Sequence, residues 1–338
     1  MFTALFGSVE LGLIYGIMAL GVYLSFRVLN FPDLTVDGSF VTGGAVAAIM
    51  IVSGYSPILA TLAAVAAGFI AGSITGTLHA KGKINPLLSG ILMMIALYSI
   101  NLRIMGNSPN IPLMREETIM TMFQSFWATL PFDGWMTSLF TTLNLPFTPS
   151  TWGILLFAIL IVVVVKLFTD FFLSTEVGLA IRATGDNPRM ISSLSANTDR
   201  LKILGLGISN AFVALSGAIV TQYSSFVDVN MGIGMIIIGL ASVIIGEAIF
   251  GKGSIFKITI AVIVGAVIYR MVVALALRVG FLETGDMKLI TAIIVIGALV
   301  VPRLLENGKE RRRKYRKARK IKEQYGGEKS VAATKSDL

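Results

Sequence analysis

Residues 175–202 read TEVGLAIRATGDNPRMISSLSANTDRLK, a polar segment between two apolar runs that are each long enough to span a bilayer. Its charged residues are Arg182, Arg189, Arg200, Lys202, Glu176, Asp186 and Asp199. Burying these charges in hydrocarbon is too costly, so the segment must lie outside the membrane. Basic residues beside membrane spans favour the cytoplasmic side. We therefore predict that this segment, here called the platform, faces the cytoplasm.

The platform has the signals of two short helices joined by a turn. Thr175 to Ala183 is predicted to be a helix, residues 185–188 a turn, and Pro188 the first residue of a second helix. The Asp or Asn just before Pro188 can cap that helix. The turn is expected to need a positive φ at Gly185. Two short helices on the cytoplasmic surface indicate a docking site for a soluble partner.

The run GLAIRATGDNP, from Gly178 to Pro188, resembles the cytoplasmic loop of bacterial ABC importer permeases of the branched-chain amino acid and ribose type. This resemblance implies a coupling helix that sits in a groove of a separate ATPase subunit. An ordinary charged loop is the alternative interpretation. The residues that the resemblance assigns to ATPase coupling are Gly178, Arg182, Gly185, Asp186, Asn187, Pro188 and Arg189.

A second patch, residues 240–254, is similar to the same family in its LASVIIG run and its GKGS turn. Glu247 stands where the family pattern has a second glycine, which weakens any transfer of sugar or branched-chain amino acid specificity. By resemblance, the nearest branch is the group of permeases encoded with tryptophan- or tyrosine-binding lipoproteins. Members of this group also look like they carry Gly-Glu in this region. The resemblance covers roughly residues 9–302 and leaves out the loop 106–150.

The composition excludes a soluble globular domain. The chain has 338 residues, of which 55% are hydrophobic and 14% charged, and its mean hydropathy is +0.81. These values indicate an all-α polytopic membrane protein. The absence of cysteine excludes disulfides and Cys-based metal or redox sites. No catalytic set is recognisable, so we predict no catalytic residue, no metal and no cofactor.

A near-match to the phosphate-binding loop occurs at residues 246–254, GEAIFGKGS. Gly253 stands where the magnesium-binding hydroxyl is needed, and no strand precedes the run. We therefore expect ATP hydrolysis in another chain.

About eight or nine membrane spans fit the apolar runs and the positions of the basic residues. This arrangement places the N-terminus outside and the C-terminus in the cytoplasm of a bacterial plasma membrane. The first span is expected to be retained, because it lacks a basic n-region and a small-residue cleavage site. The predicted spans are 9–28, 40–52, 58–78, 86–105, 152–172, 203–223, 233–250, 255–277 and 287–301.

Residues 1–305 are predicted to form the permease domain, and 306–338 a basic cytoplasmic tail. Residues 309–322 account for the whole net charge of +9. No nucleic-acid-binding motif accompanies this run, so it predicts contact with anionic lipid rather than nucleic acid. The outer loop 106–150 is rich in proline and aromatic residues and is predicted to lie on the outer interface, with a short helix near residues 116–128.

Four ionisable residues in or beside the spans are candidates for the substrate pathway, namely Asp33, Asp37, Glu247 and Arg270. Asp33 and Asp37 fit helix capping at a break equally well. Arg270 falls deep in a span, where a cation requires a carboxylate or water. Glu247 is a candidate partner for it, and an interfacial role for Glu247 is the alternative.

Two segments have a weak similarity that suggests an inverted repeat. Residues 33–40, DLTVDGSF, and 227–234, VDVNMGIG, each precede an apolar run, yet the topology has them enter from opposite faces. Inverted repeats place the pathway at their interface, often beside broken helices. Separately, glycines at positions 68, 72 and 76 share one helix face and would allow a second helix to approach closely.

Together these observations predict the membrane subunit of an ABC importer, working as a homodimer with two ATPase subunits and an extracytoplasmic substrate-binding protein. The subunit itself is not an enzyme. The substrate is expected to be a small solute, with an amino acid preferred and an aromatic one favoured by resemblance alone; a sugar or nucleoside is next. A secondary transporter or channel without an ATPase is the alternative, while a scaffold or intramembrane enzyme has no supporting site.

Overall fold

The computed structural model describes residues 2–135, 138, 151–194, 196–251 and 253–276, with isolated positions between 289 and 300. The chain divides into two compact units, Met1–Ala292 and Ile293–Leu338, and the fold below is that of the first unit. The ninth predicted span, 287–301, lies largely outside the described residues, and the basic tail, 306–338, lies entirely outside them.

Within the described residues, seven helices are long and apolar enough to cross a membrane, and an eighth apolar helix is shorter. An α-helix satisfies its own backbone hydrogen bonds, which is why apolar runs adopt this form in lipid. The all-α polytopic fold is confirmed, and each of the first eight predicted spans corresponds to one helix. They are α1 (Phe2–Val22) with its π-helical continuation η1 (Tyr23–Val28), α2 (Thr35–Val52), α3 (Pro57–Ala80), α4 (Pro86–Ile104), α7 (Gly153–Ser174), α10 (Thr198–Ser224), the shorter α11 (Met235–Phe250) and α12 (Ile255–Ala276).

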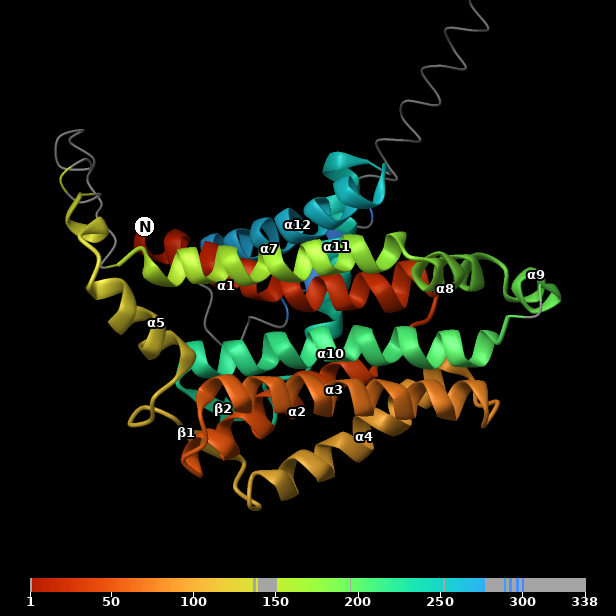
Figure 1. Ribbon diagram of the computed structural model, residues 1–338, viewed down its shortest axis with the longest axis horizontal. Helices are drawn as coiled ribbons and strands as arrows, with labels where there is room; N and C mark the ends of the chain where they lie inside the picture. The colour runs from red at the N-terminus through yellow and green to blue at the C-terminus, as the bar shows by residue number, and fades with distance from the viewer. Residues whose placement is uncertain are drawn as a thin grey trace, which may run out of the picture. The chain divides into compact units, whose positions relative to one another are not determined.

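Short elements lie at the two ends of this bundle (Figure 1). One end, where the N-terminus also lies, has β1 (Asn110–Pro112), β2 (Phe226–Asp228) and α5 (Ile119–Ala128), and the other has α8 (Glu176–Asp186) and α9 (Pro188–Ser193). The two strands pair antiparallel, with Ile111 opposite Val227. The helix predicted in the outer loop is confirmed as α5. The described part of the outer loop, which includes β1 and α5, and the platform lie at opposite ends, as the predicted topology requires.

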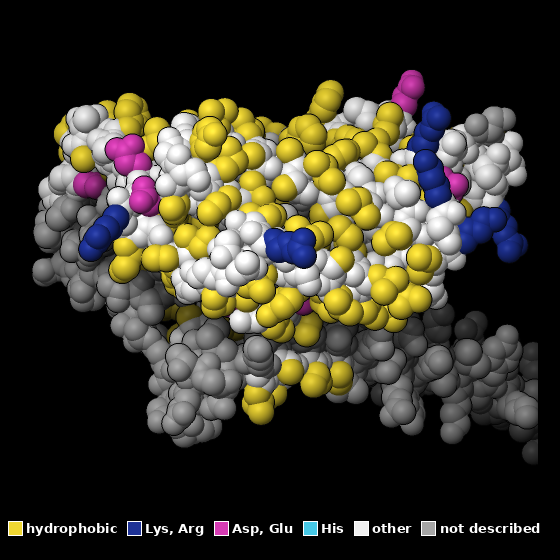
Figure 2. All heavy atoms as spheres, turned by 90° about the horizontal axis from the view of Figure 1, so that it is seen from below, with side chains coloured by type: hydrophobic (Ala, Val, Ile, Leu, Met, Phe, Trp, Pro, Cys, Tyr) yellow, Lys and Arg dark blue, Asp and Glu magenta, His cyan; other side chains and the backbone are white. Residues whose placement is uncertain are grey.

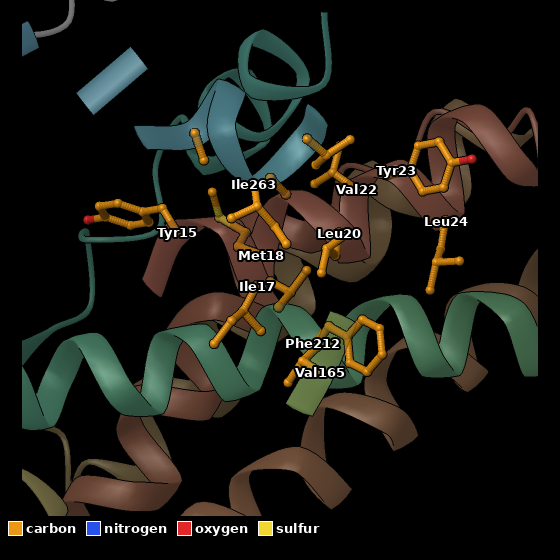
Figure 3. Close-up of a cluster of buried hydrophobic side chains, with 14 of the residues drawn as sticks. Tyr15, Ile17, Met18, Leu20, Val22, Tyr23, Leu24, Val165, Phe212 and Ile263 are labelled. Atoms are coloured by element: carbon orange, nitrogen blue, oxygen red, sulfur yellow. The ribbon is translucent and has the colours of Figure 1, made fainter. Parts of the chain in front are cut away.

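The centre of the bundle is formed by α1, α2 and α10, most of whose residues are buried, whereas α4 and α7 expose most of their surface. Figure 1 shows α10 between α1 and α3. Figure 3 shows the cluster that joins the central helices, in which α1 side chains pack with Phe212 of α10, Val165 of α7 and Ile263 of α12. A helix with apolar residues all round belongs in such a buried position.

The outside of the bundle is apolar. Large exposed hydrophobic side chains include Leu62 of α3, Ile95 of α4 and Leu160 of α7. Figure 2 shows hydrophobic side chains across the middle of one face, with acidic and basic side chains mainly toward its two ends. This distribution is expected of a surface that contacts lipid between two polar interfaces.

The glycine face of α3 packs against α10. A Cβ atom added at Gly72 would overlap the backbone carbonyl oxygen of Leu206, and one at Gly76 would lie 2.7 Å from the Cα atom of Ile203. Small residues permit such backbone contacts, and van der Waals packing is a main source of helix association in lipid. The predicted close approach is confirmed, and α10 is the partner.

We expect Gly72→Val to destabilise the protein by about 1–3 kcal/mol, because the added side chain would force the backbones of α3 and α10 apart. Ala66→Val, at an exposed position of the same helix, is the matched control and should change little. Thermal unfolding in detergent, followed by tryptophan fluorescence, measures both variants. Equal melting temperatures would contradict the packing described here.

Candidate functional site

The platform consists of two capped helices. The Thr175 hydroxyl accepts a hydrogen bond from the Gly178 N–H at 3.2 Å and so caps α8. Asn187 Oδ1 accepts from the Met190 N–H at 3.1 Å and caps α9, which begins at Pro188. Side-chain oxygens at the N-cap satisfy backbone donors that a helix cannot pair internally. The two predicted short helices are confirmed, although the first extends to Asp186 rather than ending at Ala183.

The prediction that Gly185 needs a positive φ is wrong. Gly185 lies within α8 and is absent from the positive-φ glycines of the described chain. A glycine is needed here because there is no room for a side chain: an added Cβ would overlap the carbonyl oxygen of Val28, the last residue of η1. Gly178 meets the same limit, because its Cβ would overlap the carbonyl oxygen of Phe172 in α7. Both glycines therefore let the platform sit directly on the membrane helices.

One side of the platform is buried and the other is open. Ile181 of α8 is 1% exposed, and Ile191 of α9 is buried as well. The predicted coupling residues Arg182, Asp186, Asn187, Pro188 and Arg189 are exposed, whereas Gly178 is buried and Gly185 is half-buried. Large apolar side chains are exposed beside them: Val177, Leu179, Met190 and Leu194. Apolar side chains mixed with cations on an exposed surface are typical of a protein-binding patch.

An ion pair within α7 links this helix, which leads into the platform, to α12. Lys166 Nζ lies 2.5 Å from Asp170 Oδ2, and it also lies 3.2 Å from the centre of the Phe256 ring. Thr259 of α12 donates a hydrogen bond to Asp170 Oδ1 at 2.7 Å. Sequence reasoning missed this pair, although opposite charges four residues apart in an apolar run were a usable signal.

Glu247 of α11 pairs with Arg27 of η1 and not with Arg270. The helix η1 is in contact with both α11 and α8. The end of α11, the π-helical end of the first span and the platform therefore meet in one region. π-Helical turns of this kind are frequent at functional sites.

Arg270 of α12 places its guanidinium 5.0 Å from the centre of the Tyr15 ring. Near the same end of the bundle, the Tyr223 hydroxyl of α10 donates to Glu10 of α1 at 2.9 Å. An aromatic face attracts a cation through its quadrupole. The Arg270 cation therefore lies against an aromatic ring of α1, while Glu247, the carboxylate considered in the sequence, pairs with Arg27.

Asp33 is buried in the turn between η1 and α2. Its Oδ1 accepts from the Thr35 N–H at 2.9 Å, and its Oδ2 accepts from Asn210 Nδ2 of α10 at 2.6 Å. Thr35 in turn lies 2.8 Å from Thr75 of α3, oxygen to oxygen. Burial raises the pKa of the Asp33 carboxyl above its ordinary value, and the hydrogen bonds from Thr35 and Asn210 oppose this increase. Asp33 therefore holds the start of α2 to α10.

Asp37 caps a different helix from its own. Its two carboxylate oxygens accept hydrogen bonds from the N–H groups of Gly234, at 2.9 Å, and Ile236, at 2.8 Å. These residues form the beginning of α11, and Gly234 has a φ of +89°. A carboxylate at a helix N-terminus satisfies orphan donors and interacts favourably with the helix dipole.

The two segments with similar sequences lie in contact. A Cβ added at Gly232 would overlap the carbonyl oxygen of Asp37, which places 227–234 against 33–40. In each case an irregular segment precedes a short apolar helix, α2 or α11. The inverted repeat stays a prediction.

The described residues include no group of His, Cys, Asp and Glu side chains that could hold a metal ion. The arrangement consists of helix caps, close backbone contacts and ion pairs that link one helix to another. Such links fix the angles between helices and can transmit a displacement of one helix to its neighbours.

Residues 4–301 match the family model described as branched-chain amino acid transport system / permease component. The chain belongs to this permease family. The match extends through nearly all of the predicted permease domain and includes both patches whose residues resemble the family.

The relatives of the permease include two whose names give different solutes. The tyrosine transport system permease protein of Clostridioides difficile (strain R20291) is 43% identical over 292 residues, which cover 86% of this chain and 89% of that protein. Uncharacterized protein RP368 of Rickettsia prowazekii is 33% identical over 296 residues, covering 86% and 95%. The ribose import permease protein RbsC of Escherichia coli (strain K12) is 25% identical over 284 residues, covering 83% and 77%. No solved structure matches the permease.

We expect Lys166→Met to destabilise the permease by about 3–5 kcal/mol, because it leaves the Asp170 carboxylate without its buried partner. The double variant Lys166→Met with Asp170→Leu removes both charges and should recover part of this loss. The free energy of unfolding of the purified permease in detergent is measured for the natural protein, both single variants and the double variant. A double variant no more stable than Lys166→Met would contradict the pairing.

Proposed function

We propose that the permease is the membrane subunit of an ABC importer and works as a homodimer with two ATPase subunits and an extracytoplasmic substrate-binding protein. The observation that carries the proposal is the platform: two capped helices seated on the membrane helices, with cations and apolar side chains exposed on the open side. A groove in an ATPase subunit is the partner that such a surface would fit. The family match supports the same assembly.

The substrate in this proposal is an amino acid, with an aromatic one favoured. Its support is the relative described as a tyrosine transport system permease, which is far more similar to this chain than the ribose permease is. A sugar is the next candidate. The permease imports the solute from the binding protein to the cytoplasm, and ATP hydrolysis takes place in the partner.

Coupling in this proposal runs through the candidate residues Gly178, Arg182, Gly185, Asp186, Asn187, Pro188 and Arg189. ATPase closure moves the platform, and the platform moves η1 through the close contact between Gly185 and Val28. The substrate pathway lies where segments 33–40 and 227–234 meet. Asp33, Asp37, Glu247 and Arg270 shape it by holding α2, α11 and α12 in position.

A secondary transporter or channel is the second candidate, since it would also use an inverted repeat and an intramembrane Arg270. Its weakness is that it gives no role to the capped, partly apolar platform. In both cases we place the permease in a bacterial plasma membrane, with the N-terminus outside, the platform and the C-terminus in the cytoplasm, and the basic tail on anionic lipid.

Coupling is tested by ATPase measurements on the complex reconstituted in membranes, with and without loaded binding protein. We expect Arg182→Glu and Gly185→Val to abolish substrate-stimulated hydrolysis while the permease still inserts and dimerises. Arg182→Glu reverses an exposed charge of the docking surface, and Gly185→Val lifts α8 away from Val28. Lys81→Glu, at an exposed position outside the platform, is the control and should retain stimulation. Full stimulation in both platform variants would reject the ABC proposal.

Orientation is tested by labelling, which is convenient because the natural chain has no cysteine. A cysteine at the exposed Ser125 of α5 should react with a membrane-impermeant maleimide added to intact cells. One at the exposed Ser193 of α9 should react only after the membrane is opened. Labelling of Ser193→Cys in intact cells would reverse the proposed topology.

A further inference from the structure

A cavity of about 360 Å³ lies between the platform and the ends of the membrane helices beneath it. Its walls come from α8 and α9, from the turn after η1, and from α3, α4 and α10. Its volume falls within the roughly 300–1,000 Å³ that small-molecule sites occupy. Three of the proposed coupling residues, Gly185, Asp186 and Pro188, are among its lining residues.

A fixed cation lines one side of the cavity. Lys202 Nζ lies 3.2 Å from His79 Nε2, and His79 Nδ1 lies 2.8 Å from the carbonyl oxygen of Ile84. A lysine ammonium only donates, so His79 Nε2 accepts, and the proton of the neutral imidazole is on Nδ1, which donates to Ile84. The histidine thus uses one of the three ammonium donors and holds Lys202 in place.

A carboxylate and an aromatic ring complete the lining. Asp186, the last residue of α8, lines the cavity on the platform side. Within the described residues, neither Asp186 nor Lys202 belongs to an ion pair. Phe31 packs edge-on to His79, with ring centres 5.2 Å apart, and Leu206 adds an apolar wall.

We propose that this cavity binds a zwitterionic amino acid with an apolar or aromatic side chain. The carboxylate of the ligand pairs with Lys202, its ammonium with Asp186, and its side chain packs against Phe31 and Leu206. A simple anion would leave Asp186 as a repulsive neighbour, and a simple cation would meet Lys202. A molecule with both charges and an apolar part can pair with the cation and the carboxylate and can also pack against the apolar wall.

Such a ligand would join the platform helix α8 to the membrane helix α10, because Asp186 belongs to α8 whereas Lys202 belongs to α10. It would stabilise whichever state keeps these two groups near each other and would thereby slow the coupling motion. This consequence, inhibition of import by amino acid on the cytoplasmic side, rests on the proposed function. The binding itself does not.

Titration calorimetry on the purified permease in detergent tests the binding, with L-phenylalanine as the probe. We expect saturable binding that Lys202→Met or Asp186→Asn weakens at least about tenfold, since each removes a charge-assisted hydrogen bond. Arg200→Met and Asp199→Asn, exposed charges outside the cavity lining, are the matched controls and should bind as the natural permease does. Lys202→Arg should retain binding, which separates loss of charge from loss of fold.

Two analogues test the two charges of the ligand separately. N-acetylphenylalanine lacks the ammonium and phenylalanine methyl ester lacks the carboxylate, so each should bind at least about tenfold more weakly. Equal binding of either analogue or of sodium acetate, no binding to the natural permease, or unchanged binding in Lys202→Met would overturn the proposal. If Lys202→Met does not fold, the exposed Asp186→Asn decides alone.

The assembled complex then tests the regulatory consequence. Phenylalanine should inhibit ATP hydrolysis by the natural complex and by Asp199→Asn, and should have little effect on Lys202→Met, which removes a cavity charge outside the proposed coupling residues. Binding needs no ATPase partner, so a failure of the coupling tests leaves the calorimetric result standing. A failure of calorimetry leaves the coupling tests standing in the same way.

Discussion

The contact of α10 with the backbones of α2 and α3 is the constraint on which the rest of the structure depends. A Cβ at Gly43 of α2 would overlap the Ala214 carbonyl oxygen, and one at Gly217 of α10 would overlap that of Phe40. In lipid the hydrophobic effect gives little drive for helices to associate, so close van der Waals contact must supply it. The buried position of α10 follows, and so do the positions of the polar groups it carries, such as Asn210 beside Asp33.

Much of the fold could be predicted because the membrane imposes it. Apolar runs in lipid must be helical, so span positions followed directly from composition, and a cap just before Pro188, at Asp186 or Asn187, followed from local sequence. Tertiary partners could not be predicted in this way. A glycine has the same local signature whether it needs a positive φ or only close approach, which is why the reason assigned to Gly185 was wrong.

The charges in the membrane show the same limit. Sequence identifies Arg270 and Glu247 as costly groups, but only the packing shows that Arg270 rests on Tyr15 and that Glu247 pairs with Arg27. Lys166 and Asp170 are one turn apart and could have been found from their spacing. Their effect on the fold, however, depends on Thr259 and α12, which sequence spacing does not reveal.

The contacts form a continuous connection from the middle of the bundle to the platform. Asp37 holds the beginning of α11, and Glu247 near the end of the same helix pairs with Arg27 of η1. The carbonyl oxygen of Val28, the last residue of η1, then meets Gly185 of α8. The helix α11 is shorter than a full span and is held near both ends by charged groups, Asp37 at its start and Arg27 near its end. In the proposed coupling mechanism, a displacement of α8 against Val28 is passed along these contacts to the segment where the two similar sequences touch.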